Sequence, residues 1–376
     1  MTASIRNTML RRPKKTVFVG LSGGVDSSVA ALLLQRQGYH VVGVYLKCWE
    51  GLVTPRGLQF ADSCNWRAER RDAAAVAATL GIPFRTYDFT DKYRREVVDE
   101  FFEEYAVGHT PNPDVSCNRS IKFGAFFDEA MRDGADYIAT GHYVRRRDTS
   151  DGAQILTGVD TTKDQSYFLW SLTQSQLARS LFPVGEFTKV RIRQLANEAH
   201  LPTANKKDSQ GICFIGPVSL RAFLEAGLTL TPGDIKTLDG RVIGQHSGAA
   251  LFTVGQRHGV AVSGVAPFYV VRVSVSENIV YVAPGHDNPA LFQSVVALSH
   301  ASWLRAAPTI GQTYTARIRY RQKLVPVTVD YSEDSLLLHF AEPQRAVTPG
   351  QSAVLYDGDV VMGGGVIVDN PTASRR

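Results

Sequence analysis

Over roughly the first 200 residues, short continuous apolar runs alternate with stretches of helical periodicity. Runs such as 16–21 (TVFVGL), 40–47 (HVVGVYLK) and 84–89 (FRTYDF) have the length of strands, and the segments between them have the spacing of amphipathic helices. Near-continuous apolar strands separated by helices predict a parallel sheet that is covered on both faces. In such α/β sheets, ligands bind beyond the carboxyl ends of the strands.

The pattern changes near residue 230, where helical periodicity stops. Short strands separated by Gly, Pro, Asn and Asp follow, which is typical of small all-β modules. We therefore expect four parts: a flexible basic tail (1–15), an α/β catalytic domain (16–220), a small β-rich central domain (221–291) and a C-terminal β-rich domain (292–376).

Composition limits the classes of function. The chain of 376 residues has a net charge of +5 and a pI near 9.0, which suits an anionic partner such as RNA, DNA or a nucleotide. No apolar stretch approaches the ~18–20 residues of a membrane helix, so no membrane partner is expected. The four cysteines (Cys48, Cys64, Cys117 and Cys213) form no C-x-x-C pair and no zinc-type cluster. Reduced thiols, a cytoplasmic location and no structural metal site are the expectation.

The segment Ser22-Gly23-Gly24-Val25-Asp26-Ser27-Ser28 follows the first strand directly and opens a helix. Two glycines let backbone N–H groups approach an anion, and the helix adds free N–H groups with a positive dipole end. Asp26 would either cap the helix or orient a metal-bound phosphate. The chain has no Gly-Lys-Ser or Gly-Lys-Thr, so this predicts a phosphate site other than the common nucleoside-triphosphate loop.

This loop resembles the pyrophosphate-binding loop of the ATP pyrophosphatase superfamily. The resemblance implies that ATP is cleaved between its α and β phosphates, and that AMP is transferred to a carbonyl-like oxygen of a substrate. The nucleophile that then displaces AMP could be nitrogen or sulfur, and the loop does not decide between them.

Two cysteines bear on that choice. Cys117 lies in residues 109–124 (HTPNPDVSCNRSIKFG), where the prolines predict an irregular loop and a helix beginning near Asn118. A thiol at a helix N-terminus has a lowered pKa and is a better nucleophile. Cys213 lies between two glycines in residues 206–216 (KKDSQGICFIG), and its residues alone fit a buried strand cysteine equally well.

Six motifs occur in the order and spacing of the tRNA-specific 2-thiouridylases: SGGVDSS, TPNPDVSCNRSIKFG, ATGHYVRR, KDQSYFLW, DSQGICFIG and FTVGQRHG. The resemblance runs from about residue 16 to the last strands. It implies an ATP pyrophosphatase domain followed by two small β-rich modules, the last a β-barrel that binds tRNA. It also implies ATP-dependent transfer of sulfur to C2 of the wobble uridine (position 34) through an adenylated uridine and a cysteine persulfide. Mg²⁺ would accompany ATP, and a sulfur-relay protein or cysteine desulfurase would donate the sulfur.

The resemblance also implies roles for individual residues. The ATP phosphates would be bound by Gly20, Leu21, Ser22, Gly23, Gly24, Val25, Asp26 and Ser27, and the rest of the nucleotide by Leu46 and Gly141. The target base would meet Asn112, Pro113 and Asp114, with Asp114 also serving as an acid or base. Cys117 would be the nucleophile and Cys213 the persulfide carrier. The tRNA would contact His142, Lys163, Asp164, Gln165, Arg319, Tyr320 and Gln351.

A basic stretch, residues 316–323 (ARIRYRQK), predicts an RNA surface on its own terms. On a strand, Arg317, Arg319, Arg321 and Lys323 would share one face and could follow a phosphate backbone. A solvated edge strand with protective charges is the alternative. Further basic positions follow the GHY segment (Arg145, Arg146 and Arg147) and precede Cys213 (Arg191, Arg193, Lys206 and Lys207).

Two other functions remain open from sequence. An amidotransferase-type ATP pyrophosphatase ligase would use nitrogen as nucleophile and would need neither Cys117 nor Cys213. A non-catalytic RNA-binding protein would use only the β modules, although the intact glycine loop argues against it. Cys48 and Cys64 belong to no motif.

Overall fold

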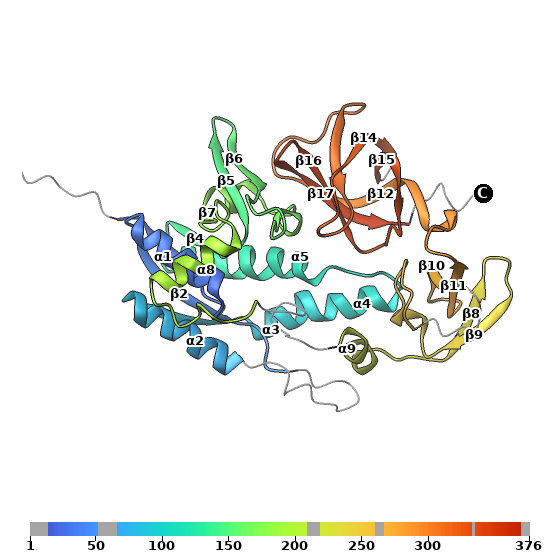
Figure 1. Cartoon of the computed structure of the whole chain (residues 1–376), viewed down its shortest axis with the longest axis horizontal. Coiled ribbons are helices and arrows are strands. Elements are labelled where there is room, and N and C mark those ends of the chain that lie inside the picture. The colour runs from blue at the N-terminus through green and yellow to red at the C-terminus, as the bar shows by residue number, and fades with distance from the viewer. Residues whose placement is uncertain (1–13, 52–65, 209–218, 260–266, 333–334, 370–376) are drawn as a thin grey trace, which may run out of the picture.

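The computed structural model describes residues 14–51, 66–208, 219–259, 267–332 and 335–369. Within these ranges a parallel sheet, a small mixed sheet and a β-barrel follow one another along the chain (Figure 1). The α/β class with two following β-rich modules, the last a barrel, is thereby confirmed. None of the helices in the described ranges is both long and apolar enough to cross a membrane.

The first sheet has five parallel strands in the order β3-β2-β1-β4-β7. The strands are β1 (Thr16–Gly20), β2 (His40–Lys47), β3 (Phe84–Asp88), β4 (Tyr137–Ala139) and β7 (Ser180–Leu181). The chain adds β2 and β3 on one side of β1 and β4 on the other. The strand order therefore reverses between β1 and β4, and ligands bind at such a point in open α/β sheets.

Helices cover both faces of this sheet, because alternate residues of β1 enter different cores. Val17 and Val19 pack with residues of α1, α2 and α8, whereas Phe18 packs with the helices between β3 and β4. The first set is α1 (Val25–Arg36), α2 (Trp66–Leu80) and α8 (Lys189–Glu198). The second set is α3 (Thr90–Tyr93), η1 (Arg94–Asp99), α4 (Glu100–Ala106), α5 (Pro113–Cys117), η2 (Asn118–Ala125) and α6 (Phe126–Arg132).

A hairpin and a small mixed sheet connect this domain to the barrel. The hairpin is β5 (Val144–Thr149) and β6 (Gly152–Thr157), and it is followed by η3 (Ser166–Phe168) and α7 (Gln174–Ala178). The central part has α9 (Leu220–Gly227), η4 (Ala249–Leu251) and a sheet ordered β10-β11-β8-β9. Its strands are β8 (Gly233–Thr237), β9 (Val242–His246), β10 (Phe268–Ser274) and β11 (Ile279–Pro284).

Six antiparallel strands close into the C-terminal barrel, because β12 pairs with β17 as well as with β15. After the short η5 (Pro289–Leu291) come β12 (Phe292–Trp303), β13 (Thr313–Arg317), β14 (Val325–Ser332), β15 (Ser335–Arg345), β16 (Ser352–Asp357) and β17 (Val360–Val368). The catalytic-domain hairpin extends this sheet, since Leu156 of β6 pairs with Val360 of β17. The barrel is thus attached to the α/β domain by backbone pairing.

The expectation of a strand over residues 316–323 is wrong. Strand β13 ends at Arg317, and Ala316 already pairs with Val325 of β14, so the residues between them form the hairpin connection. Arg321 has a positive φ of 64°, which a strand does not contain. The alternation of basic residues therefore does not place four cations on one face.

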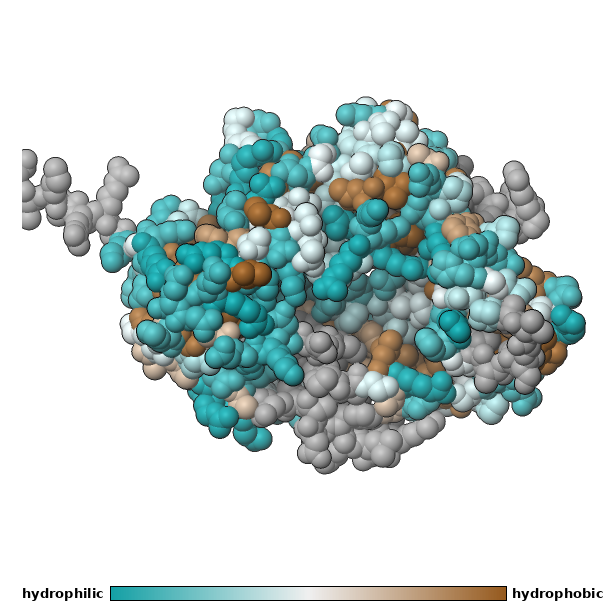
Figure 2. All heavy atoms as spheres, viewed as in Figure 1, coloured by the Kyte–Doolittle hydropathy of each residue, from teal (hydrophilic) through white to brown (hydrophobic). Residues whose placement is uncertain are grey.

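The described residues expose few large apolar side chains. Figure 2 shows a largely hydrophilic face on which hydrophobic residues form separate patches. Exposed examples on the described surface, such as Val107, Val190 and Ile310, come from different elements. Scattered apolar residues of this kind are normal and mark no interface by themselves.

Candidate active site

The glycine loop lies at the point where the strand order reverses. Gly23 has a φ of 73°, and a Cβ there would lie 2.5 Å from the backbone oxygen of Glu69. Gly24 is the N-cap of α1 and no side chain caps that helix, so its first N–H groups face the loop. The hydroxyls of Ser27 and Ser28 both donate to the Gly24 carbonyl, at 3.2 and 2.7 Å. These bonds hold the loop in a shape that fits an anion at the helix start.

Asp26 does not cap α1, which removes one of its two expected roles. Its carboxylate accepts a hydrogen bond from the Tyr143 hydroxyl at 2.6 Å and pairs with Lys189, whose Nζ lies 2.8 Å from each oxygen. Burial, followed by the Asp26 charge, raises the pKa of Tyr143 well above its ordinary value, so this hydroxyl stays a donor. Asp26 therefore presents a partly exposed carboxylate, paired with Lys189, beside the glycine loop.

A cluster of charges that sequence reasoning missed surrounds this carboxylate. Asp208 forms ion pairs with Lys189, Lys163 and Arg193, at 2.8, 2.8 and 2.7 Å. Partial burial acts to raise the pKa of Asp208, but Lys163 and Lys189 outweigh it and lower the pKa to about 2. No local pattern marks Lys189, because it reaches Asp26 across 163 positions of the chain.

Lys206, which the sequence suggested as a surface cation for RNA, contacts the glycine loop. Its Nζ donates to the Gly23 carbonyl at 2.9 Å and pairs with Asp72 at 2.7 Å. Glu69, behind the same glycine, has a pKa raised by burial, which Lys206 partly opposes. The three Arg residues of β5 are likewise engaged: Arg145 with Asp359, Arg146 with Asp148 and Arg147 with Gln154.

The positions expected to contact the rest of the nucleotide flank this loop. Leu46 lies near the carboxyl end of β2, and Gly141 follows β4. A Cβ on Gly141 would lie 2.7 Å from the backbone nitrogen of Ser27, so a side chain there would collide with the loop. Leu21 and Val25 are 1% and 3% exposed, which leaves mainly their backbone atoms for a ligand.

The expectation that Cys117 stands at the start of a helix near Asn118 is wrong. Helix α5 begins at Pro113, and the Asn112 side chain caps it by accepting from the N–H groups of Asp114 and Val115. Proline suits the first helical position, where its missing N–H is not needed. Cys117 is therefore the last residue of α5, one turn inside the helix, and it is 0% exposed.

The helix continues from Cys117 in an unusual form. Residues 118–125 form the π-helical segment η2, and such segments occur often at functional sites. A Cβ on Gly124 would lie 2.8 Å from the carbonyl oxygen of Arg119, so this glycine allows the wider turn. Gly124 is the sequence signal that could have indicated it. Asp114 lies in the first turn of α5 and is partly exposed.

His142 is buried beside this helix. It is 6% exposed, its Nδ1 lies 2.8 Å from the Thr140 hydroxyl, and its ring packs near Phe123. Burial, with a further contribution from Lys122, places its pKa well below the ordinary value. The imidazole is therefore neutral at pH 7, and its contact with tRNA stays a prediction.

The other protein residues that are predicted to contact tRNA lie between the α/β domain and the barrel. The Asp164 carboxylate is 4% exposed and pairs with Arg317 at 3.3 Å, and Gln165 accepts a hydrogen bond from the Tyr143 N–H. Tyr320 packs on Phe168 with ring centroids 4.5 Å apart. Arg319 donates to the carbonyls of Arg345 and Ala346, and Gln351 to those of Thr110 and Pro111.

Two of the four cysteines lie outside the described residues: Cys213, the predicted persulfide carrier, and Cys64, which belongs to no motif. Cys48 is 2% exposed and packs in the core of the α/β domain. Within the described ranges, no group of three or more His, Cys, Asp or Glu side chains could hold a metal ion.

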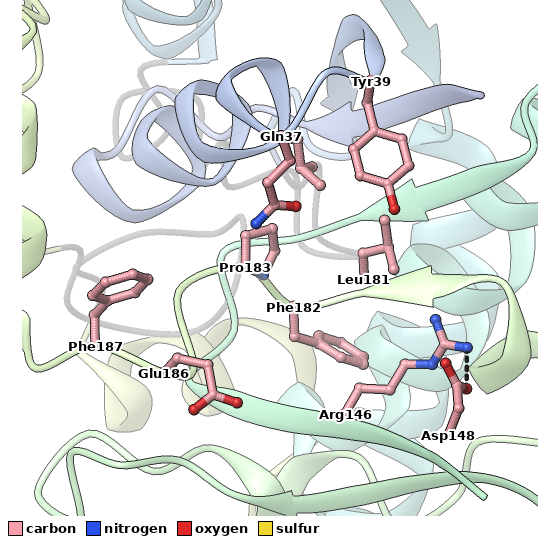
Figure 3. A pocket seen from close by; sticks show the side chains of 10 residues that line it. Gln37, Tyr39, Arg146, Asp148, Leu181, Phe182, Pro183, Glu186 and Phe187 are labelled. Carbon is pink, nitrogen blue, oxygen red and sulfur yellow. Dashed lines mark hydrogen bonds and ion pairs between the residues drawn. The ribbon is translucent and has the colours of Figure 1, made fainter. Parts of the chain in front are cut away.

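A separate hollow of about 350 Å³ lies away from the loop (Figure 3). Its wall includes Gln37 just after α1, Phe182 and Glu186 after β7, and the ion pair between Arg146 and Asp148. Helix α1 starts at the loop and has 12 residues, so its far end is about 18 Å away at 1.5 Å per residue. None of the predicted site residues lines this hollow.

Three family models match successive parts of the chain. Residues 15–217 match the tRNA methyl transferase HUP domain, residues 221–284 the tRNA methyl transferase PRC-barrel domain, and residues 293–367 the aminomethyltransferase beta-barrel domain. The first of these alone covers more than half of the chain. A solved structure of a 4-thiouridine synthetase in complex with RNA and ATP is similar over 54% of this chain and 45% of the synthetase chain, with 22% sequence identity. Its TM-score is 0.35.

Similarity to curated proteins extends over nearly the full length. The tRNA-specific 2-thiouridylase MnmA of Cupriavidus metallidurans is 48% identical over 361 residues, covering 94% of this chain and 99% of the relative. The tRNA-specific 2-thiouridylase MnmA of Nitrosomonas eutropha is 46% identical over 364 residues, covering 95% and 99%. The chain therefore belongs to the tRNA-specific 2-thiouridylase family.

Proposed function

We propose that the protein transfers sulfur to C2 of the wobble uridine of tRNA in an ATP-dependent reaction that forms 2-thiouridine. The observation that carries the proposal is the glycine loop at the reversal of strand order, with an uncapped helix start beside Asp26 and Lys189. Both relatives are tRNA-specific 2-thiouridylases, which supports thiolation as the reaction and tRNA as the substrate.

ATP is the proposed activating substrate. The backbone of Gly20–Ser27 would hold its phosphates, and Leu46 and Gly141 would contact the rest of the nucleotide. Mg²⁺ commonly binds through one or two carboxylates together with substrate phosphates. Asp26 fits that role, because its carboxylate lies beside the loop and is only partly buried.

The proposed chemistry makes the uridine oxygen a leaving group. O2 of the uridine attacks the α-phosphorus of ATP, and pyrophosphate leaves. The terminal sulfur of a persulfide on Cys213 then reaches C2, either directly or as sulfide released by Cys117, and AMP departs. In the direct route the terminal sulfur bonds to C2 as AMP leaves, and the Cys117 thiolate then attacks the Cys213 sulfur, which breaks the sulfur–sulfur bond and leaves 2-thiouridine. In the other route Cys117 attacks the Cys213 sulfur first and expels sulfide, which then displaces AMP from C2. Both routes end with a Cys117–Cys213 disulfide, which a thiol reductant must reduce before the next turnover. Asn112, Pro113 and Asp114 would receive the base, which must be unstacked to be reached.

The remaining parts of the proposal concern partners and organisation. The tRNA would bind across His142, residues 163–165 and the barrel residues Arg319, Tyr320 and Gln351, and a sulfur-relay or desulfurase protein would load Cys213. We assign residues 16–220 to catalysis, 221–291 to a central domain and 292–376 to tRNA binding, after a tail over 1–15. The cytoplasm is the proposed location.

Single-turnover thiolation tests this function. The protein is mixed with Mg-ATP, a persulfide donor and an unmodified tRNA that has a wobble uridine. Product is read by retardation in a mercury gel and by nucleoside mass. We expect 2-thiouridine, AMP and pyrophosphate from the wild type, and no thiolated product from Cys117→Ser or Cys213→Ser.

The same experiment separates the alternatives. Thiolation that survives in both cysteine variants would overturn the roles given to the thiols. Cleavage of ATP to AMP without a thiolated product from any tRNA would favour an amidotransferase-type ligase. Binding of tRNA without any ATP cleavage, lost in Arg319→Ala, would favour a non-catalytic RNA-binding protein.

A further inference from the structure

The segment just before the helix of Cys117 lies where all three parts of the protein meet. Figure 1 shows the barrel above α4 and α5, with the central sheet beyond the end of α4. From the barrel, the carbonyl of Pro349 accepts a hydrogen bond from the Thr110 N–H at 2.8 Å. The Gln351 side-chain amide donates to the carbonyls of Thr110 and Pro111, at 2.7 and 3.3 Å. The barrel thus binds this segment through its backbone.

The contact is also sterically close. Gly350 has a φ of 89°, and a Cβ there would lie 2.8 Å from the Thr110 nitrogen and 3.0 Å from the His109 Cβ. A side chain at this position would push the two segments apart. The segment around Thr110 can therefore approach the barrel this closely only because residue 350 is glycine.

The central domain holds the same residue from another side. The hydroxyls of Thr253 and Thr110 lie 3.0 Å apart, and Tyr105, which is 3% exposed, forms side-chain hydrogen bonds with both. Thr253 belongs to the FTVGQRHG motif, to which the proposed reaction gives no role. In the same motif, a Cβ on Gly255 would lie 2.6 Å from the Ala346 Cβ of the barrel. This motif therefore joins the central domain both to Thr110 and to the barrel.

These contacts lie next to the residues expected to react. Pro111 and Pro113 restrict the backbone on either side of Asn112, the cap of the helix that contains Asp114 and Cys117. A stiff segment transmits the position of its fixed end to the helix that follows. The carbonyls of Thr110 and Pro111 precede the helix and cannot take part in its backbone hydrogen bonds. The Gln351 amide donates to both carbonyls, which would otherwise need another hydrogen-bond partner.

We propose that this junction, formed by Thr110, Thr253, Gly350 and Gln351, positions the helix of Cys117 for sulfur transfer. Gln351 is then a positioning residue, in addition to any contact it makes with tRNA. The inference rests on the proposed function, since it concerns the nucleophile of that reaction. The barrel holds the catalytic segment as well as the tRNA, so tRNA docking and nucleophile placement depend on the same residues.

The first test needs neither tRNA nor ATP. The rate of alkylation of Cys117 is measured by peptide mass spectrometry in the free protein, with Cys48 as internal reference, because both thiols are buried. We expect Gln351→Ala and Thr253→Val each to raise the Cys117 rate about threefold to tenfold, the equivalent of one lost hydrogen bond, with Cys48 unchanged. Gln293→Ala, which removes an exposed glutamine of the same barrel, should change neither rate.

The double variant Gln351→Ala/Thr253→Val tests whether both residues act through Thr110. Its Cys117 rate should differ from the product of the two single effects, as expected for residues that share a partner. In single-turnover thiolation at saturating tRNA, Gln351→Ala should lose about tenfold or more in rate, because small misplacements of reacting groups are costly. Gln351→Glu, which keeps the length but loses the donor, should not restore the rate.

Three results would overturn the proposal. Unchanged Cys117 alkylation, with only a higher tRNA concentration for half-saturation, would make Gln351 a tRNA contact alone. A parallel rise at Cys117 and Cys48 would indicate general destabilisation. Multiplicative effects in the double variant would mean that the two residues do not act together. If the proposed function is wrong, the wild type gives no thiolated tRNA, whereas the alkylation rates of Cys117 and Cys48 still report on the junction.

Discussion

Asp26 shows how single residues define the chemistry of the loop. A carboxylate beside a phosphate site would repel the phosphate unless a cation compensates it, and Lys189 provides that charge with Nζ 2.8 Å from both oxygens. The same ammonium lies 2.8 Å from Asp208, so it links the carboxylates of Asp26 and Asp208. Its side chain is 11% exposed, which limits screening by solvent.

Replacing Lys189 should weaken ATP binding. Lys189→Met keeps the length of the side chain and removes the charge, leaving Asp26 and Asp208 without this partner where the polyphosphate would bind. We expect the dissociation constant for ATP to rise about tenfold or more, since a hydrogen bond to a charged group is worth about 1.5–3 kcal/mol. Titration calorimetry at fixed salt measures it. Arg191→Met on the same helix, which breaks an exposed pair with Glu198, is the control. Equal ATP affinity in the two variants would contradict this role.

At the scale of elements, the loop and α1 depend on the neighbouring helix α2 as much as on their own residues. Gly23 lies against the backbone of Glu69 in α2, and the Lys206 ammonium donates a hydrogen bond to the Gly23 carbonyl. Helix α5 shows the same dependence, because its start at Pro113 is set by the Asn112 cap and by the neighbouring barrel loop. Each element is encoded locally but positioned by its neighbours.

Gly23→Ala should disable the loop far beyond its effect on backbone strain. Gly81→Ala is the matched control: Gly81 also has a positive φ, of 62°, but a Cβ there would meet nothing within 4 Å. In both variants the free energy of unfolding should fall by about 1–2 kcal/mol, because alanine is strained in the left-handed conformation. Gly23→Ala must in addition displace the Glu69 carbonyl, so we expect a larger loss of stability and no measurable ATP binding. Chemical denaturation and ATP titration measure the two effects. ATP binding by Gly23→Ala at the level of Gly81→Ala would refute the argument.

At the scale of the whole molecule, the barrel and the α/β domain share a polar interface. Arg317 of β13 pairs with Asp164, and the Tyr167 hydroxyl donates to the Ser352 carbonyl at 2.8 Å. The Trp170 Nε1 donates to the Ser352 hydroxyl at 3.0 Å. These bonds lie beside the predicted tRNA residues 163–165, so that segment belongs structurally to both domains.

When the buried ion pair is broken, we expect the two domains to unfold in separate transitions. Arg317→Met leaves the Asp164 carboxylate buried without its cation, which costs about 3–5 kcal/mol for pairs of this kind. Arg305→Met is the control, since its pair with Asp151 also joins barrel to hairpin but is exposed, and such pairs are worth about 0–1 kcal/mol. We expect calorimetry to show an earlier transition only for Arg317→Met. Indistinguishable curves for the two variants would show that the pair does not hold the interface.

The sequence alone determined the features that depend on neighbouring residues. Apolar strands alternating with helical periodicity indicated the parallel sheet, and SGGVDSS indicated the glycine turn between β1 and α1, because a strand, two glycines and a helix start are contiguous in the chain. The same reasoning failed at residues 316–323, where the alternation of Arg317, Arg319 and Arg321 resembles a strand but a hairpin connection intervenes. It also failed at Pro113, which begins a helix instead of ending one.

Only the tertiary structure decided which distant residues meet. Lys189 and Asp208 join Asp26, and Gln351 meets Thr110 across 241 positions. The physical reason is that a salt bridge or side-chain hydrogen bond needs atoms within about 3–4 Å, and only packing of whole elements brings distant segments that close. Local sequence determines the strands, the helices and the glycine turn, whereas the charges around the loop and the contacts that hold the Cys117 helix arise from how the domains pack.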